Sequence, residues 1–217
     1  MSQIPIFRET CPAADESSGI FRQFSHPTGW LGWWIGQIVA VTNRTQSEWV
    51  LESISVQPDD YILEMGFGAG TDITLVSALA IHGFVAGIDR SAVMVRQAKQ
   101  RNAAAIEAKQ VELHCGCALS IPYPDAMFDE IFSINVVQFW TNPLAELAEL
   151  KRVLKSGGSI ALAIQPRIPN ASEATSQATG KFLLKLLNEA GFDRIELKSK
   201  LMKPVSIVCV LGIKKSA

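Results

Sequence analysis

Short apolar runs alternate with amphipathic stretches through most of the chain. The helical period marks residues 72–81, 92–105 and 181–190 and a stretch that begins at Asn142-Pro143. Apolar runs predict strands from Tyr61 and over residues 83–89, 111–115, 128–134, 159–165, 193–199 and 205–213. This alternation predicts an α/β protein with a largely parallel sheet. The short link through Lys203-Pro204 predicts that the last two strands pair antiparallel.

The first 54 residues follow a different pattern. Residues 1–28 are rich in proline and other turn formers, which disfavours regular structure, whereas residues 28–44 and 47–54 favour one or two helices. We therefore divide the chain into an N-terminal lid or helical extension, residues 1–54, and a sheet domain, residues 55–217.

Two segments are candidate lids over a site at the sheet. Trp30 and Trp33 lie in the N-terminal extension, where they either pack against the sheet or line an acceptor site and exclude water. Residues 166–180 are small and polar and follow a predicted strand, so they are the second lid candidate.

A glycine-rich loop follows the first strand, at Glu64-Met-Gly66-Phe-Gly68-Ala-Gly70. Glycines permit a sharp turn and let backbone approach a ligand closely, and the next helix directs free N–H groups at the loop. Asp89 ends the second strand about twenty residues later, where a carboxylate can accept from ribose hydroxyls.

Two ligands compete for such a loop. A dinucleotide prefers a third small residue at the position that Thr71 holds, and Glu64 would repel its pyrophosphate. A carboxylate at the mouth of the strand suits an ammonium or sulfonium cation instead. The residues therefore favour a cationic nucleoside over a dinucleotide.

Together with this loop, Asp89, the segment 122–129 and Leu154-Lys-Ser-Gly-Gly158 resemble the class I S-adenosylmethionine-dependent methyltransferases over roughly residues 45–215. The resemblance implies a Rossmann-like seven-stranded, mostly parallel sheet with an antiparallel last strand and helices on both faces. It also implies S-adenosylmethionine as cofactor, bound by Glu64, Gly66, Phe67, Gly68, Gly70, Asp89, Arg90, Cys117, Ala118 and Asn135.

The sequence departs from the family pattern at Cys117, where the family commonly has an acid that accepts from the adenine amino group. A thiol is a weak acceptor, so we expect backbone groups around Cys117 and Ala118 to meet the adenine edge. The departure also leaves open a cofactor-binding module without catalysis.

Acceptor contacts are expected at the tip of the fourth strand. The resemblance directs Gln138, Phe139 and Trp140 toward the substrate, although both aromatic residues are equally suited to helix-to-sheet packing. Methyl transfer by in-line displacement needs a general base only for an acceptor that must lose a proton early. Our candidates for that base are His26 and Tyr123.

Composition and charge limit the classes of acceptor that we expect. A chain of 217 residues with net charge −1 and a pI near 6.3 shows no overall attraction to nucleic acid, so we expect a small-molecule acceptor that is apolar or aromatic. A phospholipid or related amphiphile is the alternative, because tryptophans crowd the N-terminal extension. A homodimer is left open.

Cysteine usage and apolar runs bear on location. The four cysteines match neither zinc-ligand spacing nor a disulfide framework, which predicts reduced thiols, no metal site and a cytoplasmic protein. The sequence has no secretory signal pattern. The longest apolar run, residues 30–41, is too short to cross a bilayer, so no integral membrane segment is expected.

Overall fold

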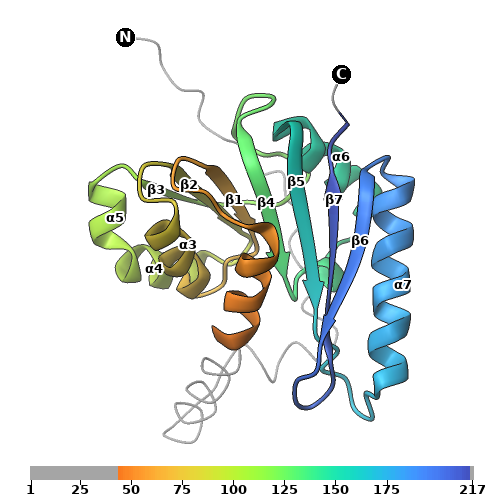
Figure 1. The fold of residues 1–217 in the computed structure, drawn as a ribbon. Coiled ribbons are helices and arrows are strands. Elements are labelled where there is room, and N and C mark those ends of the chain that lie inside the picture. The colour runs from red at the N-terminus through yellow and green to blue at the C-terminus, as the bar shows by residue number, and fades with distance from the viewer. Residues whose placement is uncertain (1–43, 216–217) are drawn as a thin grey trace, which may run out of the picture. The chain divides into compact units, whose positions relative to one another are not determined.

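The computed structural model describes residues 44–215, and the unit of residues 46–217 contains all seven strands (Figure 1). A helix ends at residue 54 and is followed by alternating strands and helices. In chain order these are β1 (Tyr61–Met65), α3 (Thr71–Leu79), β2 (Phe84–Asp89), α4 (Ala92–Arg101), α5 (Ala103–Glu107), β3 (Val111–Cys115), β4 (Phe128–Ile134), the short 3-10 helix η1 (Val137–Phe139), α6 (Pro143–Val153), β5 (Leu154–Ile164), α7 (Glu173–Glu189), β6 (Asp193–Lys200) and β7 (Ile207–Ile213).

The seven strands form one sheet in the order β3-β2-β1-β4-β5-β7-β6. Strands β1 to β5 are parallel, whereas β7 runs antiparallel to both β5 and β6. The chain reverses its direction of sheet building between β1 and β4, which is the position where open α/β sheets bind ligands. The predicted fold class is confirmed.

Successive core residues face opposite sides of the sheet. Ile62 packs with the helix over residues 46–54, α3 and α4, whereas Leu63 packs with α6 and α7. Val85 and Ala86 of β2 repeat this alternation. Strands buried on both faces need near-continuous apolar sequence, which explains why these runs stood out.

The predicted helix over residues 92–105 is divided in two in the structure. Asn102 is 4% exposed and interrupts the helix, because its side-chain Nδ2 donates to the carbonyls of Ala98 at 2.9 Å and Gly70 at 3.0 Å. The strand predicted to begin at residue 159, after a turn at Gly157 and Gly158, begins instead at Leu154. The two glycines lie in an irregular part of β5, where the register with β4 shifts, and not in a turn before it.

Helix α7 begins eight residues earlier than the predicted start at Lys181. Its sheet-facing side uses small and polar residues there, which hides the apolar period. Ser176 Oγ donates to the Ser206 carbonyl at 2.8 Å, and a Cβ on Gly180 would lie 3.0 Å from the Leu197 side chain. The segment proposed as a second lid, residues 166–180, is therefore helical from residue 173, and only residues 166–172 of it are irregular.

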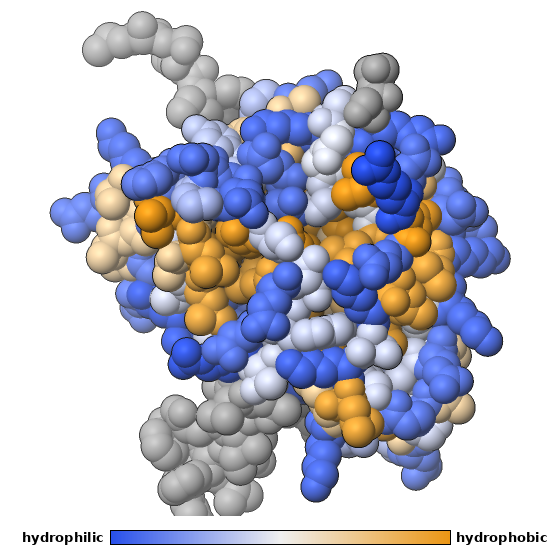
Figure 2. All heavy atoms as spheres, in the orientation of Figure 1, coloured by the Kyte–Doolittle hydropathy of each residue, from blue (hydrophilic) through white to orange (hydrophobic). Residues whose placement is uncertain are grey.

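Apolar side chains also gather on one outer face, over the helix that ends at residue 54 and α3 (Figure 2). An open groove of about 490 Å³ lies there, lined by Leu51, Val56, Leu75, Leu79 and neighbouring residues. None of the glycine-loop residues lines this groove. Among the described residues, no helix is long and apolar enough to cross a membrane.

Candidate cofactor and acceptor site

The glycine loop leaves β1 at the switch point of the sheet. Gly66, Gly68 and Gly70 have φ angles of +82°, +52° and +75°, which side chains rarely allow. A Cβ on Gly66 would lie 2.3 Å from a methyl group of Val136, whereas a Cβ on Gly68 would meet nothing within 4 Å. The backbone at Gly68 therefore faces open space, as a loop that meets a ligand requires.

Asp89 connects the tip of β2 to this loop. One carboxylate oxygen accepts from the Gly68 N–H at 2.8 Å, and the other accepts from the Ser91 N–H at 2.8 Å. Each oxygen retains a further lone pair for another donor. Ser91 caps α4 by accepting from the Met94 N–H, so Asp89 is not needed as the side-chain cap.

Glu64 is a buried carboxyl with an unsatisfied oxygen. It is 2% exposed, and Oε2 is the one buried side-chain polar atom in the described part of the chain that has no hydrogen-bond partner. Burial raises the pKa of Glu64 well above its ordinary value, and the negative charges of Asp72 and Asp89 raise it further. An unpaired buried carboxyl is costly, so its retention favours a cationic ligand.

Three amide residues form a closed ring of hydrogen bonds at the tips of β4 and β5. We call Gln46, Asn135 and Gln165 the amide ring. Gln46 Nε2 donates to Gln165 Oε1 at 2.5 Å, the Gln165 N–H donates to Asn135 Oδ1 at 2.8 Å, and Asn135 Nδ2 donates to Gln46 Oε1 at 3.1 Å.

The amide ring holds together the segments at the carboxyl ends of β4 and β5. Gln46 and Gln165 are almost fully buried, and Asn135 has a φ of +59°. Gln165 Nε2 also donates to the carbonyls of Lys203 at 3.1 Å and Val205 at 2.7 Å. The ring thereby joins the start of the unit, two strand tips and the β6–β7 loop in one satisfied buried network.

Comparison with known proteins identifies the family. The chain is 30% identical over 179 residues to the uncharacterized methyltransferase YdaC of Bacillus subtilis, covering 82% of this chain and 97% of that protein. This chain belongs to the class I S-adenosylmethionine-dependent methyltransferases. A family model described as a methyltransferase domain matches residues 63–162 of this methyltransferase.

Other relatives agree. A demethylmenaquinone methyltransferase of Symbiobacterium thermophilum is 35% identical over 104 residues, covering 47% of this chain and 41% of its own. Among solved structures, a SAM-dependent methyltransferase from Aquifex aeolicus has a TM-score of 0.63 at 25% identity, covering 77% of this chain and 88% of its own. The protein is therefore an enzyme that uses S-adenosylmethionine, as predicted.

The residues of this methyltransferase fit that cofactor. Glu64 has an unpartnered buried oxygen for a cation, Gly68 has the open backbone that a bulky ligand needs, and Asp89 has acceptor capacity at the second strand tip. Among residues 44–215, no cluster of His, Cys, Asp and Glu has the composition of a metal site.

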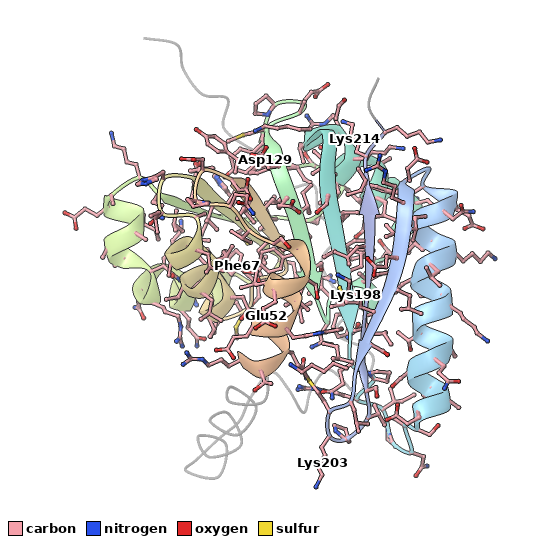
Figure 3. The ribbon with its side chains drawn as sticks, in the orientation of Figure 1. Glu52, Phe67, Asp129, Lys198, Lys203 and Lys214 are labelled. Atoms are coloured by element: carbon pink, nitrogen blue, oxygen red, sulfur yellow. The ribbon has the colours of Figure 1, made fainter. Side chains whose placement is uncertain are left out.

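The residues predicted to bind the cofactor differ in how far their side chains are exposed. The Phe67 ring is buried against Gly87 and Ile73, so only its backbone belongs to the loop surface (Figure 3). Ala118 is 1% exposed in the core, whereas Arg90 is exposed. Cys117 is disulfide-bonded, which corrects the expectation of four reduced thiols.

The predicted acceptor residues divide between surface and core. Gln138 is exposed and donates through Nε2 to the Asn135 carbonyl at 3.0 Å, and Phe139 is 45% exposed. Trp140 packs partly buried against the core, as its packing interpretation predicted. The predicted residues His26, Trp30 and Trp33 lie outside the described part of the chain.

Tyr123 lies at the wrong end of the sheet for the predicted catalytic role. Its ring contacts those of Phe84 and Phe128, which are the first residues of β2 and β4, so it lies near the amino ends of these strands. The Tyr123 hydroxyl donates to Glu112 at 3.2 Å, and burial followed by the nearby Glu112 charge raises the Tyr123 pKa. A phenol with a raised pKa is a poor base at neutral pH.

Three residues that the structure brings to the strand tips were not predicted from the sequence, namely Gln46, Asp72 and Gln165. Asp72 follows the glycine loop by two positions, and this adjacency was a usable signal. Gln165 ends a strand at the predicted ligand edge, which was a weaker signal. Gln46 is 119 positions from its partner Gln165, and no local pattern indicates the pair.

Proposed function

We propose that this methyltransferase transfers the methyl group of S-adenosylmethionine to a small apolar or aromatic acceptor by in-line displacement. The cofactor supplies a methyl group on a positively charged sulfur, which is a good leaving group. The protein then has to hold the acceptor in line with that methyl group and exclude water, and such alignment lowers the barrier by several kcal/mol.

The cofactor assignment follows from the chemistry of the strand tips. Glu64 pairs with the cofactor's ammonium, and Asp89 accepts from the ribose hydroxyls with its remaining lone pairs. The open backbone at Gly68 permits close approach, and the backbone at Cys117 and Ala118 meets the adenine edge. These roles account for the unpaired oxygen of Glu64.

The observation that carries the acceptor class is the apolar character of the loops at the carboxyl ends of β4, β5 and β6. These loops carry Phe139, Ile168 and Leu201, which are 45%, 63% and 82% exposed. Gln165 links the last two loops through its bonds to the Lys203 and Val205 carbonyls. The likeness to a demethylmenaquinone methyltransferase agrees with an apolar aromatic acceptor.

An amphiphile is the second candidate acceptor. Leu201 is the most exposed large apolar residue among those the structure describes, and Lys200 and Lys203 flank it in the sequence. Figure 3 shows Lys203 at the end of the molecule to which the β5 and β6 strands point. A protruding apolar side chain with flanking cations suits a lipid headgroup boundary.

The test combines binding with turnover. Titration calorimetry should show S-adenosylmethionine binding, and release of S-adenosylhomocysteine should then be measured with quinones, phenols, polar amines and phospholipid vesicles. Methylation of quinones or phenols supports the proposal, and methylation confined to vesicle lipids favours the second candidate. Methylation confined to polar amines would refute both, and absence of cofactor binding would refute the cofactor assignment.

Paired variants localise the acceptor site. Leu201→Ser should raise the KM for an apolar acceptor several-fold and leave the cofactor Kd unchanged. Ile81→Ser is the matched control. Ile81 is 59% exposed, but it precedes β2 and therefore lies at the amino ends of the strands, away from the proposed acceptor site. Three roles stay predictions, namely His26 as general base and Trp30 and Trp33 of the N-terminal extension as acceptor-lining residues. Cytoplasmic location and a homodimer stay predictions as well.

A further inference from the structure

Asp72 lies in the first turn of α3, immediately after the glycine loop. Ser47 Oγ donates to Asp72 Oδ1 at 2.7 Å, and Ser47 itself is 1% exposed. The hydroxyl therefore fixes the orientation of the Asp72 carboxylate from the helix over residues 46–54. An acid in a first helical turn can also serve the helix alone, so this bond by itself assigns no ligand.

A second observation does point to a ligand. Asp72 interacts electrostatically with Glu64, whose Oε2 is buried without a hydrogen-bond partner. Asp89, at the tip of β2, adds a third negative charge to this cluster. No ion pair within residues 44–215 includes any of these three carboxyls.

Such a cluster is unfavourable in the empty protein. Like charges repel, and burial penalises each ionised form. Burial raises the pKa of Asp72, as it does that of Glu64, while the Ser47 hydrogen bond acts in the opposite direction. The arrangement becomes favourable when a cation enters between the carboxyls, and an ammonium has three donors to distribute among them.

We propose that Asp72, oriented by Ser47, is a second carboxylate of the cofactor's ammonium subsite and acts together with Glu64. This inference rests on the proposed cofactor assignment and extends it. In this arrangement Glu64 approaches from the tip of β1 and Asp72 from the start of α3. Ser47 occupies Oδ1 of Asp72, and the second oxygen accepts from the ammonium.

The experiment measures binding of two neutral-sulfur ligands to the purified full chain by calorimetry. S-adenosylhomocysteine carries the amino-acid group, whereas 5′-methylthioadenosine lacks it. Asp72→Asn should weaken S-adenosylhomocysteine binding roughly 10- to 100-fold, because a charge-assisted hydrogen bond is lost. The same variant should change the Kd of 5′-methylthioadenosine less than about twofold.

Two further variants complete the design. Ser47→Ala should weaken S-adenosylhomocysteine binding roughly fivefold, again without an effect on 5′-methylthioadenosine. Glu52→Gln is the charge-matched control, because Glu52 is an exposed acid on the same helix (Figure 3) and should leave both ligands unaffected.

The outcomes separate this inference from the proposed function. If Asp72→Asn weakens the binding of both ligands equally, Asp72 merely supports the loop. If the variant binds S-adenosylhomocysteine more tightly, Asp72 faces the ligand's carboxylate. Either result overturns the inference. An unchanged Kd for Asp72→Asn also overturns it. Failure of the unmodified chain to bind S-adenosylhomocysteine would instead overturn the cofactor assignment.

Discussion

Glu130 in β4 is paired in register with Ile62 of β1 and Ser159 of β5, and its carboxylate accepts from the Ser159 hydroxyl. Burial raises the pKa of Glu130 to about 8, Ser159 partly opposes this, and the Asp60 and Asp129 charges add to it. The folded protein thus holds a proton that the unfolded chain has released. We expect Glu130→Gln, which is neutral at every pH, to remove this linkage.

The sign follows from the proton count. Between pH 4.5 and about 8 the folded state binds more protons at this site than the unfolded state, so stability falls as pH rises. Over this pH range the free energy of unfolding falls by about 1.4 kcal/mol for each pH unit. The total loss is about 4 kcal/mol once the partial hydration of Glu130 is allowed for. Below pH 4.5 the Glu130 carboxyl is neutral in both the folded and the unfolded state, so Glu130→Gln and the unmodified protein should have the same free energy of unfolding.

Chemical denaturation at pH 5, 6.5, 8 and 9 measures this effect. The free energy of unfolding of Glu130→Gln, relative to the unmodified protein, should increase at each step and level off above pH 8. Glu107→Gln, an exposed acid of α5, is the control and should show no such trend. If the two stability curves of Glu130→Gln and the unmodified protein run parallel, the reasoning is wrong.

Three further predictions concern the site. Gly66→Ala should lower the free energy of unfolding by about 3 kcal/mol, because Gly66 has a φ of +82° and the new Cβ would lie 2.3 Å from Val136. The same variant should bind S-adenosylhomocysteine at least tenfold more weakly. Gly116→Ala is the control and should keep its stability, because its Cβ would lie 3.5 Å from the nearest atom. Gln165→Leu should cost about 3 kcal/mol, because buried partners lose their bonds, whereas the exposed Gln100→Leu should be neutral by the same assay. Tyr123→Phe should leave the S-adenosylhomocysteine Kd unchanged in calorimetry, and a tenfold loss would contradict its position at the amino ends of the strands.

The fold was largely predictable because its central strands are buried on both faces. The apolar runs at β1, β2 and β4 then need no partner information to be recognised, and the glycine loop marks where β1 ends. Helix α7 was predicted too short, since Ser176 and Gly180 replace apolar residues on its buried face. Local patterning fails wherever a polar or small residue is buried for a tertiary reason.

The site was predictable only in its local part. Glu64, Gly68 and Asp89 are recognisable because the loop and the following strand place them in sequence order. The amide ring joins residues far apart in the chain, and a single glutamine in a sequence is usually a surface residue. Tyr123 was misplaced because the connection between the parallel strands β3 and β4 crosses from the carboxyl ends to the amino ends, and Tyr123 lies late in it, beside the start of β4.

The amide ring has a consequence for how the family diverges. Two of its links join side chains, from Gln46 to Gln165 and from Asn135 to Gln46, and the third runs from the backbone N–H of Gln165 to Asn135 Oδ1. Substitution of Gln46 or of Asn135 leaves both ring neighbours with a broken bond, whereas substitution of Gln165 breaks only the ring bond to Gln46. Homologous chains should therefore change Gln46 together with Asn135 and Gln165, because both side-chain links of the ring end on Gln46. Covariation of Gln46 with the other two positions would then separate the branches of the family that have this ring from those that lack it.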